Sequence, residues 1–424
     1  MTPRATTDAG RSGRSLAGAP WLIQGSLARL LAVLSGGGEE ARVVGGAVRN
    51  TLMNLPPGDT DVATTAEPPE VIRRVEAAGF KAVPTGIDHG TLTVVIDGVP
   101  FEVTTLRVDV ETFGRKATVR FGRDWKIDAE RRDFTMNALS VDAGGAVYDY
   151  VGGFADIEAR RVRFIGDPAK RIAEDYLRIL RFFRFHAAYG HGAPDAAGLH
   201  ACIAGRAGLD QLSRERVRME LLKLLIAPGA AAALTVMAES GLLVSLLAGV
   251  PLISSFARMA EIEAALTLPP DPLRRLGALN VLVVEDAERL WQRLRLSNVE
   301  HERLTSMAQR WRGVSPDDDS AARVLLYRLG PDRFRDRMLL AFARSGAAAD
   351  DKAWRKLASL PERWTAPAFP LKAEDFIKRG VAKGPALGEA LRAAEEAWIA
   401  ANFSIDHETI ERIAANAKDR AKTA

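Results

Sequence analysis

Two aspartates separated by one residue, Asp59 and Asp61, have the side chains and spacing best suited to metal-dependent catalysis. On a β-strand, residues two apart project from one face, so the two carboxylates would lie side by side. Such a pair repels unless a cation intervenes, and carboxylate oxygens suit Mg²⁺. The spacing predicts a two-metal site that activates a hydroxyl and stabilises a leaving pyrophosphate. The alternative is a polar turn, because Pro57-Gly58-Asp59 is also favourable turn sequence.

Glu102 is a candidate third carboxylate. In the run from Pro100 to Thr105 it alternates with the apolar Phe101 and Val103, so on a strand it faces away from them. We therefore place it with the two aspartates in the predicted catalytic site. The alternative is an exposed strand glutamate without a catalytic role.

A strand-like run ends in Gly45-Gly46, ahead of a helical segment that carries Arg49. Glycines lack Cβ atoms, which lets backbone N–H groups approach a triphosphate, and a helix N-terminus adds a favourable dipole. The pattern therefore indicates nucleotide binding. Paired glycines after a strand also form ordinary turns, which is the alternative.

The elements that would position these residues change in character along the chain. Residues 21–34 and 69–78 have helical spacing, and short β-branched runs occur at 42–44, 91–96, 100–105 and 138–141. From Pro168 onward, Leu, Ala, Arg and Glu dominate in helical spacing. We predict an α+β head with a small mixed sheet, followed by an all-helical neck, body and tail.

Length and composition indicate several globular domains. The chain has 424 residues, of which 47% are hydrophobic and 26% charged, as is ordinary for globular proteins. Its one cysteine, Cys202, excludes an intrachain disulfide and fits a reducing compartment. The opening residues lack the apolar core of a signal peptide, and no later run is long enough to cross a membrane. We expect a cytoplasmic protein whose residues 1–20 form a disordered tail.

A basic segment extends from Arg160 to Arg184, although the net charge of the chain is only +4. Such a segment can hold phosphates by charge and counterion release. The alternative is a solvated helix face.

Together these motifs resemble those of one family. Val43 to Arg49, followed by Asp59 and Asp61, is similar to the first motif of the nucleotidyltransferases that include CCA-adding enzymes and bacterial poly(A) polymerases. Four further segments resemble the family's later motifs in the same order, and they lie at residues 131–138, 149–168, 174–178 and 213–220. The resemblance covers about residues 45–220, and the helical second half resembles the family in character alone.

The resemblance implies roles for matching residues. Arg131 and Arg132 would hold a triphosphate, and Asp133 would accept a hydrogen bond from a ribose hydroxyl. The nucleotide-binding candidates are Gly45, Gly46, Arg49, Arg131, Arg132, Asp133, Asn137, Asp175 and Arg178. The RNA-binding candidates are Arg160, Arg161, Lys170, Arg171 and Arg216. Asn50 stands where the family usually has aspartate, which removes one charge beside Arg49.

Asp175 and Arg178 are the candidates for base selection. They are three residues apart on a helix predicted to begin near Pro168, so a carboxylate and a guanidinium would lie side by side. That pair can match the edges of cytosine and adenine. The alternative is a structural ion pair within the helix, such as Glu174 with Arg178.

The implied activity is template-independent addition of CMP and AMP to the 3′ end of tRNA, from CTP and ATP, with two Mg²⁺ ions. Thr85 to Val94 resembles the CCA-adding form, since the Gly-Arg-Arg-Phe-type signature of poly(A) polymerases is missing. The alternatives are a poly(A) polymerase, an enzyme adding only CC or only A, and a non-catalytic RNA-binding protein. We expect tRNA and nucleoside triphosphates as partners, without a membrane or an implied protein partner. The predicted domains are a catalytic head at 21–165, a neck for base recognition and tRNA contacts at 166–230, and a tRNA-binding body and tail at 231–424.

Overall fold

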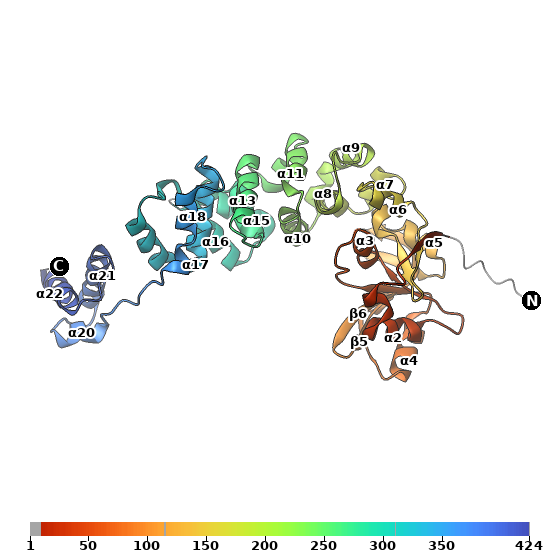
Figure 1. Cartoon of the computed structure of the whole chain (residues 1–424), viewed down its shortest axis with the longest axis horizontal. Helices are drawn as coiled ribbons and strands as arrows, with labels where there is room; N and C mark the ends of the chain where they lie inside the picture. The colour runs from red at the N-terminus through yellow and green to blue at the C-terminus, as the bar shows by residue number, and fades with distance from the viewer. Residues whose placement is uncertain (1–9, 114–115, 310, 424) are drawn as a thin grey trace, which may run out of the picture. The chain divides into compact units, whose positions relative to one another are not determined.

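The computed structural model of the chain describes residues 10–113, 116–309 and 311–423. Two compact units are present (Figure 1). The first comprises Met1–Pro251 with Arg293–Arg295, and the second comprises Leu252–Gln292 with Leu296–Ala424. Within the described ranges, no helix is both long enough and apolar enough to cross a membrane.

A mixed sheet of eight strands forms the early part of the first unit, counted over the described residues. In spatial order the strands are β1 (Arg11–Ser15), β10 (Ala146–Tyr148), β9 (Ser140–Asp142), β2 (Ala41–Val44), β3 (Asp61–Thr64), β6 (Val99–Thr105), β5 (Thr91–Ile96) and β4 (Lys81–Gly86). Neighbouring strands are antiparallel except β3 and β6, which are parallel. A separate antiparallel hairpin consists of β7 (Arg107–Phe113) and β8 (Lys116–Phe121).

The sheet is larger than the small sheet that we predicted, although β2, β5, β6 and β9 lie at the predicted β-branched runs. The prediction of a disordered tail over residues 1–20 is wrong for residues 11–15, because β1 pairs with β10. Ser12 Oγ also donates to the Val147 carbonyl at 2.9 Å. Strand β1 has the polar sequence Arg-Ser-Gly-Arg-Ser and is largely exposed at the sheet edge, so it lacks the apolar alternation that reveals a strand.

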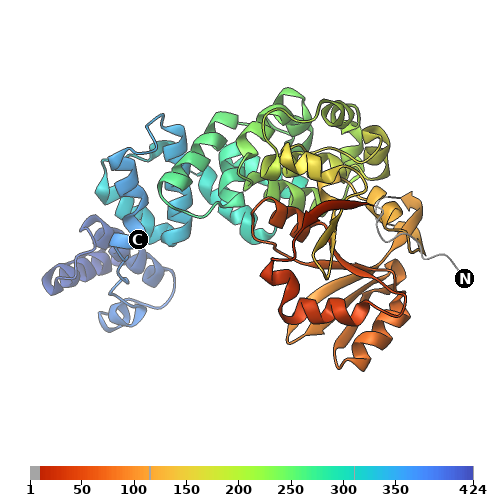
Figure 2. The same cartoon turned by 45° about the vertical axis from the view of Figure 1, so that its right-hand side comes forward.

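Two helices lie against one face of the sheet (Figure 2). They are α2 (Gly25–Leu34) and α4 (Pro68–Ala77), which contact each other and strands β2, β4 and β5. Helix α2 buries Leu27, Leu30, Leu31 and Leu34, a spacing that commits one stripe of the helix to the core. The predicted helix over 21–34 is interrupted, because Gln24 is extended and Gly25 has a φ of 72°, so a short α1 (Pro20–Ile23) precedes α2.

After β10 the first unit is helical, as predicted. Its helices are α6 (Gly153–Glu158), α7 (Pro168–Glu174), α8 (Leu177–Tyr189), α9 (Ala196–Ala204), α10 (Arg214–Leu225), α11 (Ala230–Glu239) and α12 (Leu242–Leu247). We predicted that the body begins at residue 231, but α11 and α12 belong to the first unit. The reason is that α11 packs against α8, where the Gly229 N–H donates to the Ala187 carbonyl at 2.8 Å.

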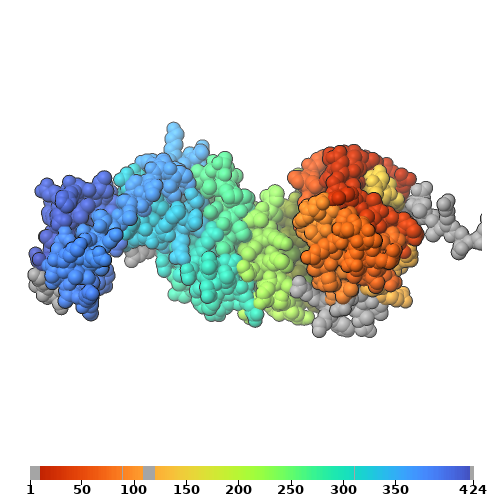
Figure 3. Space-filling model, turned by 90° about the horizontal axis from the view of Figure 1, so that it is seen from below, coloured from red at the N-terminus to blue at the C-terminus, as the bar shows by residue number. Residues whose placement is uncertain are grey.

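The second unit consists of helices throughout its described residues. It contains α13 (Ile253–Ala265), α14 (Pro272–Asn280), α15 (Val284–Leu294, which ends in the first unit), α16 (Asn298–Ala308), α17 (Asp319–Arg344), α18 (Lys352–Ala358) and α19 (Leu360–Arg363). Helix α17 is kinked because Gly330 has a φ of 74° and Pro331 follows it. The last helices, α20 (Ala373–Lys378), α21 (Pro385–Ala400) and α22 (His407–Thr423), are dark blue in Figure 3 and pack around Phe376 and Trp398.

Candidate active site

The turn after β2 brings its backbone close to polar side chains. Strand β2 ends at Val44 and α3 (Gly46–Leu52) begins two residues later, as the Gly-Gly pattern predicts. Gly45 has a φ of 73°, which side chains rarely allow. A Cβ atom at Gly45 would lie 3.5 Å from Arg132 Nη1 and 3.7 Å from the Asn137 carbonyl. Gly45 therefore allows the positive φ of the turn and leaves room for Arg132, a cation that can bind phosphate.

Arg49 is buried beside this turn and is held by four hydrogen bonds. Its Nη1 donates to Asn137 Oδ1 at 2.5 Å and its Nη2 donates to Tyr189 Oη at 2.8 Å. Its Nε and Nη2 also donate to Asn50 Oδ1, at 3.1 and 2.7 Å. Burial lowers the pKa of the Arg49 guanidinium. The amide of Asn50 thus orients Arg49 without the charge of the family's usual aspartate.

The Asn50 amide also reaches the loop that leads to Asp59. Its Nδ2 donates to the Pro56 carbonyl at 3.1 Å and to the Pro57 carbonyl at 3.3 Å. One side chain therefore joins Arg49 to the segment before the first aspartate. Our predicted site does not include Asn50, although its departure from the family pattern marks it.

Two of the three predicted carboxylates, Asp61 and Glu102, lie on the neighbouring strands β3 and β6. Asp61 is the first residue of β3, and β3 runs parallel to β6 with Val62 opposite Val103. This register places Asp61 beside Glu102. Phe101 and Val103 are buried while Glu102 is exposed, which confirms the alternation that we predicted in β6. Asp59, however, lies in a bend before β3. Gly58 has a φ of 71°, and the strand begins only at Asp61. The prediction of two aspartates on one strand is therefore wrong.

The three carboxylates also affect one another electrostatically. Partial desolvation raises the pKa of Asp61, although the residue is exposed, and the charge of Asp59 adds to this effect while Arg132 opposes it. Partial desolvation and the charge of Asp61 raise the pKa of Glu102, against the effect of Arg107. Among the residues that the structure describes, no three acidic, histidine or cysteine side chains are already spaced to hold a metal ion. Neighbouring carboxylates nevertheless fit Mg²⁺, which typically uses one or two carboxylates together with substrate phosphates.

Arg131 and Arg132 lie at the end of α5 (Trp125–Glu130) and share one carboxylate. The buried Asp128 accepts from Arg131 Nε at 2.8 Å and from Arg132 Nη2 at 3.1 Å. The charge of Arg132 also lowers the pKa of Asp61, so this cation interacts with both Asp128 and the predicted catalytic carboxylates. Asp128 is absent from our predicted site, although its spacing three and four residues before the arginines is the signal that would identify it.

Asp133 is the centre of a polar network behind the site. Its Oδ1 accepts from Asn137 Nδ2 at 3.1 Å, and its Oδ2 accepts from Arg181 Nε at 2.7 Å. Burial acts to raise the pKa of Asp133, but the charge of Arg181 and these hydrogen bonds hold it below its ordinary value. Asn137 also accepts from Arg49, so the network joins α3 to α8. The ribose contact of Asp133 stays a prediction.

The segment with Asp175 and Arg178 differs from the predicted helix. Asp175 is extended, with φ −156° and ψ 106°, and separates α7 from α8. Its Oδ2 accepts from Arg216 Nη2 at 2.7 Å. Arg178 instead binds Glu174 and donates to the Arg171 carbonyl at 2.6 Å. The two candidates therefore do not pair side by side on one helix face, and the alternative Glu174–Arg178 ion pair is present.

The RNA-binding candidates fall into two groups. Arg160 and Lys170 are exposed, and Arg161 is half-exposed in an ion pair of 2.7 Å with the buried Asp156. Arg171 and Arg216 are mostly buried, because Arg171 donates to the carbonyls of Arg131 and Arg132 while Arg216 binds Asp175. These internal contacts argue against RNA contacts by Arg171 and Arg216.

Comparisons with known proteins identify relatives along most of the chain. A family model described as Poly A polymerase head domain matches residues 41–163, and one described as Probable RNA and SrmB-binding site of polymerase A matches residues 199–255. The CCA tRNA nucleotidyltransferase 1, mitochondrial, of Danio rerio is 34% identical over 377 residues, which cover 88% of this chain and 86% of the relative. The CCA-adding enzyme of Limosilactobacillus fermentum is 30% identical over 390 residues, or 91% of this chain and 95% of the relative.

Solved structures agree with this relationship. The crystal structure of the Bacillus stearothermophilus CCA-adding enzyme in complex with CTP matches with a TM-score of 0.75 and 28% identity, covering 96% of this chain and 100% of that chain. The match confirms the predicted head with a mixed sheet and a helical remainder. The chain is an enzyme that belongs to the family of CCA-adding tRNA nucleotidyltransferases.

Proposed function

We propose that this enzyme adds CMP and AMP to the 3′ end of tRNA, using CTP and ATP and releasing pyrophosphate, to complete the sequence CCA. The observation that carries the proposal is the convergence of Asp61, Glu102 and Arg132 beside the Gly45-Gly46 turn. Acidic and basic groups in this arrangement suit a hydroxyl nucleophile on one side and a triphosphate on the other. The CCA-adding relatives support the choice of reaction and substrates.

Each part of the site has a distinct task in this proposal. Asp59 and Asp61, with Glu102 beside them, would hold two Mg²⁺ ions, which lower the pKa of the attacking hydroxyl and stabilise developing charge on the pyrophosphate. Arg131 and Arg132 face the triphosphate, and Asp128 keeps their guanidinium groups in place. The Gly46 N–H, at the first residue of α3, approaches its oxygens, while the Gly45 N–H donates to the Leu139 carbonyl at 3.1 Å and holds the turn. Asp133 binds the ribose, while Arg49 and Asn137 support the turn and Asp133.

The nucleotide base is recognised at the junction between α7 and α8. The Asp175 carboxylate accepts from the amino group of cytosine or adenine, and Arg178 donates to a ring nitrogen. Both side chains already have protein partners, Arg216 and Glu174 respectively. These partners fix the two side chains before a nucleotide arrives, which reduces the entropy lost on binding.

The predicted domains divide the task. Residues 21–165 carry the chemistry, the later helices of the first unit recognise the base and contact tRNA, and the second unit binds tRNA. The exposed Arg160, near the end of the first of these segments, and Lys170, in the second, contact phosphates. We place the reaction in the cytoplasm, although the Danio rerio relative is named as mitochondrial.

A poly(A) polymerase is the second candidate, because the matching family model is described as a Poly A polymerase head domain. A primer-extension assay separates the candidates. The substrates are a tRNA that ends before CCA, one that ends in CC, and an unrelated RNA, with CTP and ATP supplied singly and together. A CCA-adding enzyme extends the first tRNA by three nucleotides and stops. Long oligo(A) products, or addition of only CC or only A, would contradict the proposal.

A further inference from the structure

A hollow in the second unit is lined by two arginines, of which one has no acidic partner among the described residues. Its volume is about 530 Å³, and its lining includes Ser255, Arg258, Trp311 and Arg344. Arg258 is satisfied, since it donates to Glu261 at 2.7 Å and to the Ala347 carbonyl. Arg344, in contrast, forms no ion pair with an acidic side chain among the described residues.

Two of the three guanidinium nitrogens of Arg344 donate hydrogen bonds, and the third has no acceptor among the described residues. Its Nε donates to Ser255 Oγ at 3.2 Å, and its Nη2 donates to the carbonyls of Gly277 and Ala278 at 3.3 Å. Its Nη1 is buried and has no hydrogen-bond partner within the described part of the chain. A buried donor group without an acceptor costs roughly 1 to 3 kcal/mol, more when it is charged. Arg344 therefore keeps a charged side chain at the lining of the hollow, with one NH₂ group enclosed and unpaired among the described residues.

The surroundings of Arg344 add positive charge. Arg312 and Arg344 both lie over the ring of Trp311, at 4.5 and 4.7 Å from its centre. Burial and the charge of Arg312 lower the pKa of Arg344 to about 10, and Asp286 opposes this effect. Asp286 is already occupied, because it accepts from the Leu282 N–H at 2.7 Å and from Arg289 at 2.7 Å. Two close cations therefore share no dedicated counterion among the described residues.

We propose that this hollow binds a phosphate group of the RNA backbone through Arg344 and Arg312, with Trp311 positioning both guanidinium groups. The inference rests on the proposed function, which supplies the RNA. A phosphate oxygen accepts from the exposed Arg312, and the charge of the phosphate offsets the like charges of Arg312 and Arg344, since guanidinium groups bind phosphate with directed hydrogen bonds. Trp311 is itself anchored, because its Nε1 donates to the Leu282 carbonyl at 3.1 Å.

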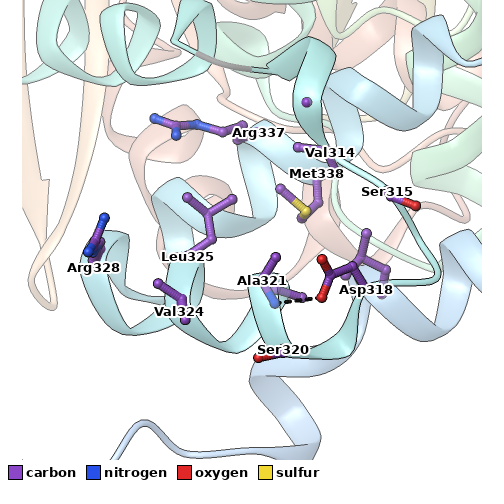
Figure 4. A pocket seen from close by; sticks show the side chains of 13 residues that line it. Val314, Ser315, Asp318, Ser320, Ala321, Val324, Leu325, Arg328, Arg337 and Met338 are labelled. Atoms are coloured by element: carbon purple, nitrogen blue, oxygen red, sulfur yellow. Dashed lines mark hydrogen bonds between the residues drawn. The ribbon is translucent and has the colours of Figure 1, made fainter. Parts of the chain in front are cut away.

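A second cavity of the same unit provides the contrast (Figure 4). It has a volume of about 600 Å³ and apolar walls that include Leu325 and Met338. Its buried cation, Arg337, donates to the Ser306 carbonyl at 2.9 Å and to Ser306 Oγ at 3.3 Å. Arg328 is an exposed cation at this second cavity, so Arg328→Gln removes the same charge from the same unit outside the proposed site.

The test compares Arg312→Gln, Arg344→Gln and Arg328→Gln in the full chain, with a tRNA that ends before CCA. Dissociation constants are measured over a series of salt concentrations, and thermal melts establish folding. We expect Arg312→Gln and Arg344→Gln each to weaken tRNA binding about tenfold and to reduce the salt slope by about 1. The Michaelis constant for CTP should not change, and Arg328→Gln should keep the wild-type slope. Arg312 is exposed, so its variant tests the site even if Arg344→Gln does not fold.

The outcomes separate this inference from the proposed function. Wild-type affinity and salt slope in folded Arg312→Gln would overturn the inference, while nucleotide addition by the wild-type chain would still support the proposed function. If wild-type enzyme fails to extend tRNA, the proposed function fails, but the binding measurement still tests the site. A melting temperature that inorganic phosphate raises through Arg312, together with an unchanged RNA salt slope, would indicate a small-anion site and overturn the inference.

Discussion

Asn50 shows how one amide can serve two parts of an active site. Its oxygen accepts from Arg49, and its nitrogen donates to the carbonyls of Pro56 and Pro57. An aspartate could keep the first contact but would place its second oxygen against two carbonyl oxygens. The segment before Asp59 is therefore bonded to an amide donor that an aspartate would not supply.

We predict that Asn50→Asp raises the Mg²⁺ concentration needed for half-maximal CTP incorporation by about tenfold, because two hydrogen bonds to the loop are lost. Asn50→Ala also loses the hydrogen bonds from Arg49, so we expect its kcat to be lower than that of Asn50→Asp. Asn54→Asp, in the same exposed loop, is the matched control. Equal Mg²⁺ dependence in wild type and Asn50→Asp would show that the amide does not position Asp59.

A second residue-scale prediction follows from the raised pKa values of Asp61 and Glu102. In folded protein without metal, both carboxyls bind protons more tightly than in the unfolded chain. Their ionised forms therefore reduce stability at neutral pH, and this penalty disappears as pH falls through the folded pKa values, in the range above the ordinary 3.8 and 4.5. Mg²⁺ favours the ionised forms and competes with those protons.

The Mg²⁺ concentration that gives half of the maximal rise in melting temperature should accordingly decrease as pH increases from about 5 to about 7.5. The measurement is a set of thermal melts across Mg²⁺ concentration and pH. Asp61→Asn should lose most of this pH dependence. A half-saturation that stays constant over the same pH range in wild type would argue against metal binding at these carboxylates.

At the scale of elements, the break between α7 and α8 is the main difference from the predicted neck. Helical apolar spacing continues through Ile172, Tyr176 and Ile179, so periodicity cannot detect that Asp175 leaves the helix. The Arg216 contact from α10, 41 residues away, draws the Asp175 carboxylate out of line with Arg178. The position of the Asp175 carboxylate therefore depends on packing between helices rather than on spacing along one helix.

Asp175→Ala and Arg178→Ala should each cost roughly 1 to 3 kcal/mol of base discrimination, on the scale of side-chain contacts to base edges. Incorporation of UTP or GTP should rise relative to CTP and ATP. Competition between paired nucleotides on a tRNA lacking its 3′ end measures this directly, with thermal melts as the folding control. If both folded variants keep the wild-type preference, these residues only stabilise the helix junction.

The sequence predicts local elements better than contacts between them. Alternation in β6 placed Glu102 on the exposed face correctly, and Gly45-Gly46 marked the turn between β2 and α3. Strand β1 was missed because an exposed edge strand needs no apolar pattern. The Asp133–Arg181 pair joins residues 48 apart, and no spacing rule along the chain connects them. The remainder depends on tertiary packing, which a single sequence does not specify.

In the molecule as a whole, both units have basic side chains that could bind tRNA phosphates. In the first unit Arg160 and Lys170 are exposed, whereas in the second Arg344 lines a hollow and Arg312 shares the ring of Trp311 with it. Phosphate contacts release counterions, so tRNA affinity should fall steeply with salt and vary little with acceptor-stem sequence. Arg160→Gln with Lys170→Gln should reduce the salt slope by about 2. Binding that is equally tight at low and moderate salt would contradict electrostatic docking.

We propose that the carboxylates beside the Gly45-Gly46 turn catalyse nucleotide addition to tRNA. The most direct measurement is single-turnover CTP incorporation into a tRNA that ends before CCA, by wild type, Asp59→Asn and Asp61→Asn. Asp97→Asn, an exposed carboxylate of the same sheet region, is the control. We predict a loss of about a thousandfold or more in both site variants, with unchanged tRNA affinity and folding, because stabilisation of several kcal/mol is removed. Near-wild-type incorporation by Asp61→Asn would show that this carboxylate is not needed for catalysis.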